Sequence, residues 1–334
     1  MKETIYERAY HQQSLKDKAF LITGGSGFIG SNIVEYLLVH GAGKVRVLDN
    51  LANGYKKNIE PFLNHPSFEF FEGDITNADT CLKAMEGIQF VSHQAALGSV
   101  PRSLANPLAT HHANATGFLN MLWAARQMNI ERIVYASSSS VYGDSPELPK
   151  REHITGNPLS PYAVSKMSNE LYAYTFCMHY DMQIIGLRYF NVFGPNQNPD
   201  NPYAAAIPLF MKALLKDQPA YIFGDGEQSR DFTFVENAVQ ANIRALFTED
   251  KDAFGKVYNI ALGESTTLNS LFNTLCDLTG KSVKPNYIAE RAGDVKNSLA
   301  DISQAQLHLG FQPLVKIKEG LALTIPWFKK TYCR

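Results

Sequence analysis

Tyr162 and Lys166 are the residues of this chain whose types and spacing are best suited to proton transfer. Residues 161–180 show a helical pattern, so these two side chains, four residues apart, lie on one face of the expected helix. A free tyrosine has a pKa of about 10 and a lysine of about 10.4, so neither is a base at neutral pH without help. A neighbouring ammonium favours the phenolate, and a tyrosine pKa of about 7 requires roughly 4 kcal/mol of differential stabilisation. Such a phenolate could remove the proton from an alcohol.

Four consecutive serines, residues 137–140, precede this pair and follow a strand-like run. One of their hydroxyls could hydrogen-bond the reacting oxygen and hold it against Tyr162. The others are expected only to stabilise a loop through backbone hydrogen bonds. A tyrosine and a lysine at this spacing also occur by chance on solvated helix faces, but the nearby serines favour the chemical interpretation. Residues 137–142 contain no Asp or Glu, so this segment holds no acid/base pair that could eliminate water.

A glycine-rich turn near the start of the chain predicts a dinucleotide site. Gly24, Gly27 and Gly30 belong to the segment TGGSGFIG, which follows a short apolar strand and opens a helical pattern. Glycines allow the backbone to approach a pyrophosphate, whose charge the N-terminus of a helix stabilises. Asp49 ends the next strand, where a carboxylate accepts hydrogen bonds from ribose hydroxyls and repels the extra phosphate of NADP. We therefore expect NAD, with the lysines at 56–57 as the one reservation, and an alcohol oxidised or a ketone reduced against its nicotinamide.

The segments that must position these residues alternate between strand-like and helix-like patterns. Strands are expected at residues 19–23, 44–48, 68–71, 90–92, 133–135 and 184–188. Helical patterns lie between them, the clearest at residues 108–128. Such alternation is typical of parallel strands joined by right-handed crossovers, with helices on both faces of the sheet. The expected fold class is α/β, a doubly wound parallel Rossmann sheet with a smaller, mostly helical C-terminal domain that binds the substrate.

The sequence pattern changes after Asn191. Several prolines between residues 195 and 208 interrupt the alternation and predict irregular loops around a substrate. Residues 232–247 are expected to return to the sheet, and the helix-rich tail, 264–327, is expected to cap the cleft. The two predicted domains are residues 1–189 plus about 232–262, which bind the cofactor, and residues 190–231 plus about 263–334.

Composition and charge restrict the possible partners. With 334 residues the chain can bury a large core, and its formal net charge of −1 offers no basic surface for nucleic acid. No apolar stretch is long enough to span a bilayer, and residues 1–11 lack the apolar core of a secretory signal. The cysteines follow no metal-binding or redox spacing, so we expect no metal, reduced thiols and a cytoplasmic protein, with a catalytic cysteine as the minor alternative. They are Cys81, Cys177, Cys276 and Cys333.

Taken together, these motifs resemble those of the extended short-chain dehydrogenase/reductase superfamily. More narrowly, the chain is similar to the bacterial UDP-N-acetylglucosamine 4-epimerases of surface-polysaccharide synthesis. The likeness spans nearly the whole chain. Besides the glycine turn, it is carried by HQAALGSVPRS at 93–103, SSSSVYGD at 137–144, SPYAVSK at 160–166, RYFNVFGP at 188–195, GDGEQSRDF at 224–232 and RAGDVKNS at 291–298.

The resemblance implies a mechanism and a set of cofactor contacts. Tyr162 would take the proton from the sugar 4-hydroxyl while hydride passes to NAD, Lys166 would bind the nicotinamide ribose, and Ser138 would contact the 4-oxygen, with Ser139 and Ser140 as secondary candidates. The 4-keto sugar would then turn over and take the hydride back on its other face, so NAD stays bound. The expected cofactor-binding residues are Gly24, Gly27, Phe28, Ile29, Gly30, Asp49, Asn50, Gly54, Asp74, Ile75, Gln94, Ala95, Ala96, Tyr162, Lys166 and Tyr189. For Asp74, a cap on the helix that starts near Asn77 is an equal alternative to an adenine contact.

The same resemblance implies that the second domain binds a UDP-sugar. The guanidinium groups of Arg230 and Arg291 would hold the diphosphate, and Tyr221 or Phe223 would stack on uracil. Asp294 would contact a ribose or, equally well, form a turn. The expected substrate-binding residues are Gly98, Ser99, Ser138, Asn191, Ala205, Ala206, Tyr221, Arg230, Arg291, Asp294 and Ser298.

Side-chain volume predicts the preferred sugar. Ser298 stands where a bulky tyrosine excludes the 2-N-acetyl group in the resembling family, and Gly98 and Ala205 are also small. This favours UDP-GlcNAc and UDP-GalNAc, with UDP-Glc and UDP-Gal as weaker substrates. The alternatives are a UDP-glucuronate 4-epimerase, another nucleotide-sugar 4-ketoreductase, or a non-enzymatic nucleotide-sugar sensor, which would have no need of the serine, tyrosine and lysine together. Family members dimerise through two helices, here expected at 106–128 and 161–180, so a homodimer is predicted.

Overall fold

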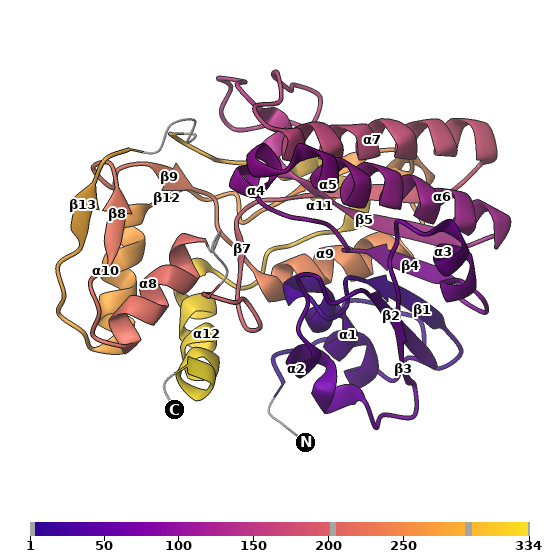
Figure 1. Cartoon of the computed structure of the whole chain (residues 1–334), viewed down its shortest axis with the longest axis horizontal. Coiled ribbons are helices and arrows are strands. Elements are labelled where there is room, and N and C mark those ends of the chain that lie inside the picture. Colours follow the sequence, from indigo (N-terminus) through magenta and orange to yellow (C-terminus); the bar gives the residue numbers. More distant parts are fainter. Residues whose placement is uncertain (1–3, 201–204, 291–295, 333–334) are drawn as a thin grey trace.

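The computed structural model describes residues 4–200, 205–290 and 296–332. A parallel sheet of seven strands forms its centre, in the order β11-β6-β5-β4-β1-β2-β3 (Figure 1). Because the inner strands are buried on both faces, their sequences are nearly continuous apolar runs, whereas the edge strand β3 is only partly buried. The strands are β1 (Ala19–Thr23), β2 (Lys44–Asp49), β3 (Phe68–Glu72), β4 (Phe90–His93), β5 (Arg132–Ser138), β6 (Ile184–Tyr189) and β11 (Val257–Ile260).

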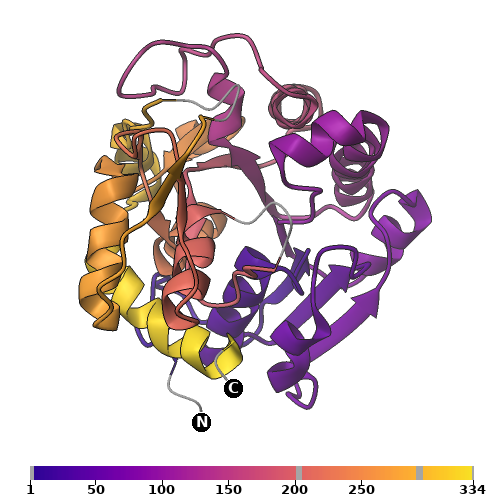
Figure 2. The ribbon, with the colours of Figure 1, turned by 60° about the vertical axis from the view of Figure 1, so that its left-hand side comes forward.

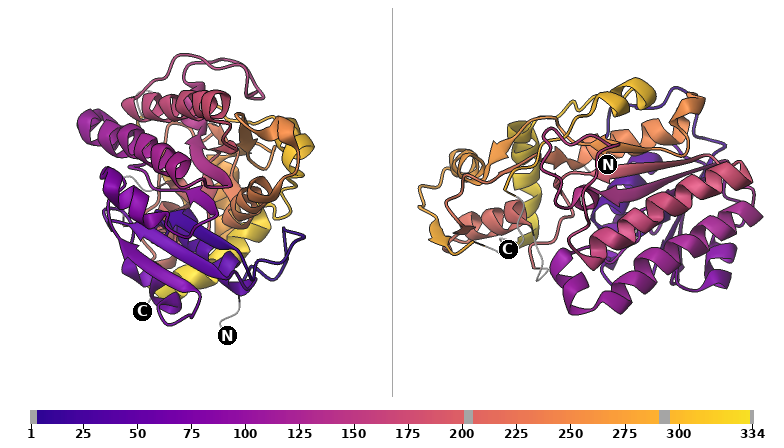
Figure 3. Two further views of the ribbon diagram at one scale, coloured as in Figure 1. Left: turned by 90° about the vertical axis from the view of Figure 1, so that its right-hand side faces the viewer. Right: turned by 90° about the horizontal axis from the view of Figure 1, so that it is seen from above.

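Helices cover both faces of this sheet, as the view from above in Figure 3 shows. One face packs against α3 (Ala78–Ala84), α6 (Gly117–Gln127) and α7 (Pro161–Tyr180). The other face packs against α1 (Phe28–Val39), α9 (Val235–Phe247) and α11 (Ser303–Leu309). This arrangement confirms the predicted doubly wound α/β fold. The shorter helices of this part are α2 (Lys56–Ile59), α4 (Val100–Ala105) and α5 (Pro107–His111).

Two segments differ from their predicted form. The single helix expected at 108–128 consists of α5, a π-helical turn at His112–Thr116, and α6. Residues 232–247 return to the sheet as the helix α9, which packs across it, whereas the edge strand β11 comes ten residues later. Nearly every residue of α9 is buried, including the polar Asn237, Gln240 and Asn242, so burial along this segment does not distinguish a helix from a buried strand.

A second unit with its own apolar core lies beside one end of the sheet (Figure 1). Figure 2 turns it toward the viewer. Its helices are α8 (Ala206–Leu215), α10 (Leu268–Thr279) and α12 (Ile317–Tyr332). Its short strands pair as β8 (Tyr221–Phe223) with β13 (Asn286–Ile288), β9 (Ser229–Arg230) with β12 (Thr266–Thr267), and β10 (Thr233–Phe234) with β7 (Val192–Phe193). The predicted residue boundaries of the two domains stay predictions.

The segment before β1 packs against the first helical layer. Tyr6, Tyr10 and Leu15 are buried in the core that α1 and α9 form with the sheet. The Tyr6 hydroxyl donates to Asn32 Oδ1 at 2.6 Å, and the Tyr10 hydroxyl donates to the Glu236 carboxylate. Within the described part of the chain, no helix is both long and apolar enough to cross a membrane.

Candidate active site

The glycine turn between β1 and α1 has the close backbone approach that a dinucleotide requires. Gly24 has φ +66°, and a Cβ there would lie 2.7 Å from the backbone nitrogen of Ala95. A Cβ at Gly30 would lie 2.3 Å from the Gly24 carbonyl oxygen. Gly27 stands at the N-cap of α1, and no side chain caps the first-turn amides there. These amides can therefore receive a pyrophosphate, with Phe28 and Ile29 in the same turn.

Asp49 is the last residue of β2, and its carboxylate is held beside the glycine turn. It accepts hydrogen bonds from the backbone nitrogens of Ser26 at 2.9 Å and Leu51 at 2.8 Å. Burial raises the pKa of Asp49, and these hydrogen bonds oppose the rise. A Cβ at Gly54 would come within 2.9 Å of the carboxylate, so the following loop packs closely on it. Asp49 thus lies where a ribose hydroxyl of the dinucleotide is expected.

Asn50 and Asp74 meet at the carboxyl ends of β2 and β3. Asn50 Nδ2 donates to Asp74 Oδ2 at 2.7 Å, and Asp74 Oδ1 accepts from the backbone nitrogen of Thr76 at 2.8 Å. Asn77, not Asp74, caps α3 through the backbone nitrogen of Thr80. The capping alternative for Asp74 is therefore wrong. Burial raises the pKa of Asp74, but hydrogen bonds from Thr76 and Asn50 outweigh it, and the pKa lies below its ordinary value. The predicted neighbour Ile75 is buried in the core under this turn.

The end of β4 faces the glycine turn across the point where the strand order reverses. The backbone nitrogens of Gln94 and Ala95 donate to the carbonyl and hydroxyl oxygens of Thr23, at 3.1 and 3.2 Å. The hydroxyl of Tyr189 donates to Gln94 Oε1 at 3.2 Å and accepts from Asn242 Nδ2 at 2.7 Å. Ligands of open α/β sheets bind at such a switch point, so these predicted contacts, with Ala96 next to them, lie where a dinucleotide would cross.

Lys166 lies on α7, one turn after Tyr162. This helix begins at Pro161, and the Ser160 hydroxyl caps it by accepting from the backbone nitrogen of Ala163. The Lys166 side chain is only 2% exposed, and its Nζ donates to the Ala136 carbonyl oxygen at 2.7 Å. Burial lowers the pKa of Lys166 to about 8. Its ammonium therefore stays largely charged at neutral pH.

Tyr162 differs from the expectation in its ionisation. Burial raises its pKa, and a hydrogen bond with the Ser138 side chain lowers it. Lys166 Nζ lies 6.0 Å from the centre of the Tyr162 ring and donates its hydrogen bond to the Ala136 carbonyl oxygen. The lysine therefore does not lower the tyrosine pKa by itself, because desolvation of the phenolate is the larger effect.

The four serines do not form one loop. β5 runs through Ser138, and Ser139 begins a short 3-10 turn that ends at Tyr142. The Ser138 hydroxyl accepts from the backbone nitrogen of Ser140 at 3.1 Å and donates to the Ser140 hydroxyl at 3.2 Å. Ser138 also lowers the pKa of Tyr162, so it lies close to the phenol, whereas the printed contacts of the Ser140 side chain are with Ser138. Because strand residues alternate in direction, Ser137 points elsewhere and donates to the Glu170 carboxylate.

A cavity of about 210 Å³ lies within the second unit, where β7, α8, β8 and β9 line it. Five predicted substrate-binding residues line it, together with Phe223: Asn191, Ala205, Ala206, Tyr221 and Arg230. Asn191 adopts a left-handed backbone (φ 36°), and its Nδ2 donates to the Asp231 carbonyl oxygen at 3.0 Å. A larger cavity, of about 520 Å³, lies at the far end of α7, and none of the predicted site residues lines it. We therefore associate substrate binding with the smaller cavity.

Three other predicted positions do not line this cavity. The backbone nitrogen of Ser298 donates to the Ser229 carbonyl oxygen at 3.1 Å, which places Ser298 next to Arg230. A Cβ at Gly98 would meet no atom within 4 Å. The Ser99 side chain caps α4 by accepting from the backbone nitrogen of Arg102 at 3.2 Å. Arg291 and Asp294 lie outside the described residues, so their predicted contacts stay predictions.

Three charged residues of this region were not predicted as site residues. Glu170, on α7, accepts from both Ser137 and Arg188 of β6. Asp231 is fully buried and accepts from the backbone nitrogens of Leu262 and Gly263, at 2.9 and 3.1 Å, and also from Ala300. Burial raises the pKa of Asp231 to about 7. Two sequence signals could have pointed to Arg188 and Glu170. Arg188 is a charged residue inside an apolar strand, and Glu170 is an acid one helical turn after Lys166.

The glycine turn, the switch point and the tyrosine–lysine pair together define a nicotinamide-dependent enzyme of the extended short-chain dehydrogenase/reductase type. Residues 20–261 match the NAD dependent epimerase/dehydratase family, and the chain belongs to that family.

The chain is similar to several proteins of this family along nearly their whole length. It is 36% identical over 311 residues to the UDP-glucose 4-epimerase of Mycolicibacterium smegmatis, covering 92% of this chain and 98% of that protein. A solved UDP-N-acetylglucosamine 4-epimerase from Methanobrevibacter ruminantium, in complex with UDP-N-acetylmuramic acid, is 41% identical with a TM-score of 0.89, covering 94% and 99% of the two chains. The UDP-glucuronic acid 4-epimerase of Bacillus cereus, solved with UDP-glucuronic acid and NAD, is 32% identical with a TM-score of 0.87, covering 94% and 100%.

These comparisons support nucleotide-sugar 4-epimerase activity and NAD as the cofactor. The residues of this chain fit that cofactor, because glycines let the turn pack tightly on itself and on the end of β4, and no side chain caps the first-turn amides of α1 that would receive the pyrophosphate. The similar proteins act on three different sugars, so they leave the choice of sugar open.

Proposed function

We propose that this chain is an NAD-dependent 4-epimerase that interconverts UDP-GlcNAc and UDP-GalNAc, with UDP-Glc and UDP-Gal as weaker substrates. The observation that carries the proposal is that Tyr162, Lys166 and Ser138 come together where the carboxyl end of β5 meets the first turns of α7. Ligands of this fold bind on that side of the sheet. A binding module would have no need of a buried base, a buried ammonium and a hydroxyl in one place.

In this proposal each side chain has one task. Tyr162 takes the proton from the sugar 4-hydroxyl, and Ser138, already its hydrogen-bond partner, holds the same oxygen. Lys166 contributes a buried positive charge beside the phenol. The glycine turn and Asp49 would hold NAD, which would supply reversible hydride transfer at the sugar C4, so the reaction would have no net oxidation. Tyr162 returns its proton to the 4-oxygen after the sugar has turned.

Substrate binding is proposed for the cavity that Asn191, Tyr221 and Arg230 line. Arg230 offers a planar cation to the diphosphate, and the aromatic rings of Tyr221 and Phe223 offer a surface for the uracil base. Among the described lining residues, Arg230 is the one that carries a charge. A uronate would add a second anion to the substrate, so this lining favours a neutral sugar.

Small residues support the N-acetylated sugars. Ser298 lies next to Arg230, and Gly98 borders open space. A large side chain at either position would compete with an acetamido group for volume, whereas a small one admits it. A roomy pocket admits a plain hexose as well, which is why weaker activity on UDP-Glc is expected.

The direct test incubates purified holoenzyme with UDP-GlcNAc, UDP-Glc and UDP-glucuronate separately and resolves the product epimers. We expect the highest kcat/KM with UDP-GlcNAc, no added NAD consumed, and little conversion of the uronate. Ser298→Tyr should lower kcat/KM for UDP-GlcNAc at least about tenfold more than for UDP-Glc, the effect of a misplaced group of this size. Equal losses on both sugars would discredit the volume argument, and preferred turnover of UDP-glucuronate would replace the proposed substrate.

We also propose a homodimer. Apolar side chains on α5, α6 and α7 are exposed on one face, which is unusual for a monomer and typical of an association surface. They include Leu108, Trp123, Val164, Leu171, Tyr174 and Met178. The cytoplasmic location and a part in polysaccharide synthesis stay predictions.

A further inference from the structure

Three consecutive turns of α7 each place one side chain against the end of β5. The Ser138 side chain lowers the pKa of Tyr162, which places it close to the phenol. Lys166 Nζ donates to the Ala136 carbonyl oxygen at 2.7 Å. Glu170, one turn further, accepts from the Ser137 hydroxyl at 2.5 Å. The helix is thus hydrogen-bonded to Ala136 and Ser137 of one strand, with Ser138 next to Tyr162, and the proposed chemistry does not use the Glu170 contact.

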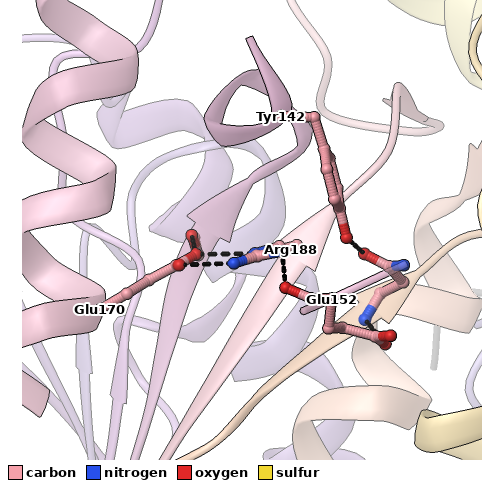
Figure 4. A network of polar contacts seen from close by, with 6 residues as sticks. Tyr142, Glu152, Glu170 and Arg188 are labelled. Atoms are coloured by element: carbon pink, nitrogen blue, oxygen red, sulfur yellow. Dashed lines mark hydrogen bonds and ion pairs between the residues drawn. The ribbon is translucent and has the colours of Figure 1, made fainter. Parts of the chain in front are cut away.

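The Glu170 carboxylate is held on its other side by Arg188. Arg188 Nε donates to Glu170 Oε1 at 2.9 Å and Nη2 donates to Oε2 at 2.7 Å, as the paired dashed lines in Figure 4 show. This two-point contact fixes both side chains in one plane. Both are nearly buried, with side chains 12% and 4% exposed. Ser137 and Arg188 are also direct neighbours in the β5–β6 pairing.

Arg188 is itself held in place by groups behind it. Its Nη1 donates to the Glu152 carbonyl oxygen at 2.9 Å, and its guanidinium lies 4.8 Å from the centre of the Tyr142 ring (Figure 4). The Tyr142 hydroxyl donates to Asn259 Oδ1 at 2.6 Å, which extends the network to β11. Burying an ion pair carries a desolvation penalty, and two apolar side chains of similar volume would fill the same space without that penalty. A role beyond stability is therefore worth seeking.

We propose that Glu170 is a positioning residue of the active site. By accepting from Ser137 and from the guanidinium of Arg188, it fixes the register of α7 along β5, so that Tyr162 meets Ser138 and Lys166 meets the Ala136 carbonyl. The inference rests on the proposed function, because it assigns to Tyr162 and Lys166 the tasks given above. Glu170 touches neither the sugar oxygen nor Tyr162 in this scheme and acts through the strand.

The charged and titratable groups around Lys166 come from several elements. His93 on β4 has its pKa lowered to about 3 by burial and by Lys166, so it is neutral at working pH. Tyr135 on β5 and Tyr142 have raised pKa values and stay protonated, chiefly because they are buried. Burial raises the pKa of Glu152, which faces Arg188. Glu170 and Arg188 therefore form a pair of opposite charges near Lys166. A substitution of Ser137 removes a contact with this pair and leaves the charge of every group unchanged.

The first test is Ser137→Ala in the NAD-bound enzyme. This substitution removes the hydrogen bond from Ser137 to Glu170. We expect kcat to fall about tenfold, because a small displacement of Tyr162 slows proton transfer, while KM for UDP-GlcNAc changes less than twofold. The weaker contact among Tyr162, Ser138 and Lys166 should also raise the Tyr162 pKa, so the acid limb of the kcat–pH profile moves to higher pH. Ser168→Ala on the same helix, whose hydroxyl donates only to the Val164 carbonyl, is the matched control and should leave both unchanged.

A second test keeps the proposal falsifiable if kcat is hard to interpret. Phenolate absorbance of the holoenzyme, after subtraction of the Tyr162→Phe spectrum, reports the Tyr162 pKa without any substrate. Ser137→Ala should raise that pKa. Glu170→Gln, which can still accept from Ser137, should retain more of kcat than Glu170→Ala. A loss of kcat by one factor at all pH values, with an unmoved phenolate titration, would show a merely structural role and overturn the proposal.

The two proposals can fail separately. If the wild-type enzyme converts none of the three UDP-sugars but Ser137→Ala still shifts the Tyr162 titration, the function is wrong and the positioning role stands. If the wild-type enzyme is active and Ser137→Ala, Glu170→Gln and Glu170→Ala all match the Ser168→Ala control, the positioning role is wrong and the function stands.

Discussion

Tyr162 and Lys166 share one face of α7, yet burial moves their pKa values in opposite directions. It raises the tyrosine pKa and lowers the lysine pKa to about 8, because in each case the uncharged form is favoured away from water. Each therefore needs a specific partner to ionise. Ser138 and the Ala136 carbonyl are those partners in the structure.

Tyr162→Phe removes the proposed base without changing the volume of the site. We expect kcat to fall by about two to four orders of magnitude, the usual contribution of general base catalysis, with NAD content and UDP binding retained. Tyr287→Phe, on the exposed strand β13 of the second unit, is the control. Turnover and bound nucleotide are measured on the same preparations, and unchanged turnover in Tyr162→Phe would refute the assignment.

Asp231 makes stability depend on pH. Its folded-state pKa is about 7 against an ordinary 3.8, so between these values the folded protein binds one more proton than the unfolded chain. The free energy of unfolding therefore falls as pH rises through this window, by at most about 4 kcal/mol. Asp231→Asn should flatten this slope, measured by urea unfolding at pH 5 and pH 8. Asp225→Asn, on an exposed turn, should retain it, and a slope unaltered in Asp231→Asn would exclude Asp231 as its source.

At the scale of elements, the site depends on where β1, β4 and α1 come together. Gly24 and Gly41 both have positive φ, at +66° and +73°, but only Gly24 faces another backbone. A Cβ at Gly24 would press on Ala95, whereas one at Gly41 would meet open space. The two positions therefore separate the cost of the backbone conformation from the cost of close approach.

Gly24→Ala should lower stability beyond Gly41→Ala and remove bound NAD. The left-handed backbone costs each variant about 1–2 kcal/mol, and only Gly24→Ala adds the overlap with the end of β4. Thermal unfolding and the nucleotide released on denaturation are the measurements. Equal melting temperatures and equal NAD content in the two variants would contradict the close approach.

At the scale of the whole molecule, the chain exposes apolar side chains unevenly. Leu171 on α7 is 64% exposed within the proposed dimer surface, whereas Leu307 on α11 is 72% exposed on the opposite helical layer. An exposed leucine is ordinary by itself, and only a cluster of them indicates an interface.

Leu171→Glu should shift the protein toward monomers, because a carboxylate would be buried without a partner in the proposed interface. Leu307→Glu, with at least as much exposure, should leave the association state unchanged. Sedimentation equilibrium of both variants at several concentrations decides between them. A wild-type protein that is monomeric throughout would remove the dimer from the proposal.

Local features of this protein could be predicted from neighbouring residues. Residues 19–23 and 161–180 were predicted with the bounds that β1 and α7 have, because apolar runs and helical spacing are written in neighbouring residues. The glycine turn and the pairing of Tyr162 with Lys166 are local in the same sense. Their types and spacing suffice to predict a dinucleotide turn and a shared helix face.

Which side chains meet across the sheet depends on tertiary packing and could not be predicted from the sequence. Ser137 and Arg188 both bond Glu170, which lies at a distance from each of them in the chain. Likewise, Asp231 is buried against residues near 262, and Tyr162 loses its contact with water through packing between elements. Ser137 and Ser138 look alike in the sequence, yet the alternation of β5 turns one toward a structural ion pair and the other toward the tyrosine. Burial and charge pairing depend on packing between elements, and no local pattern encodes them.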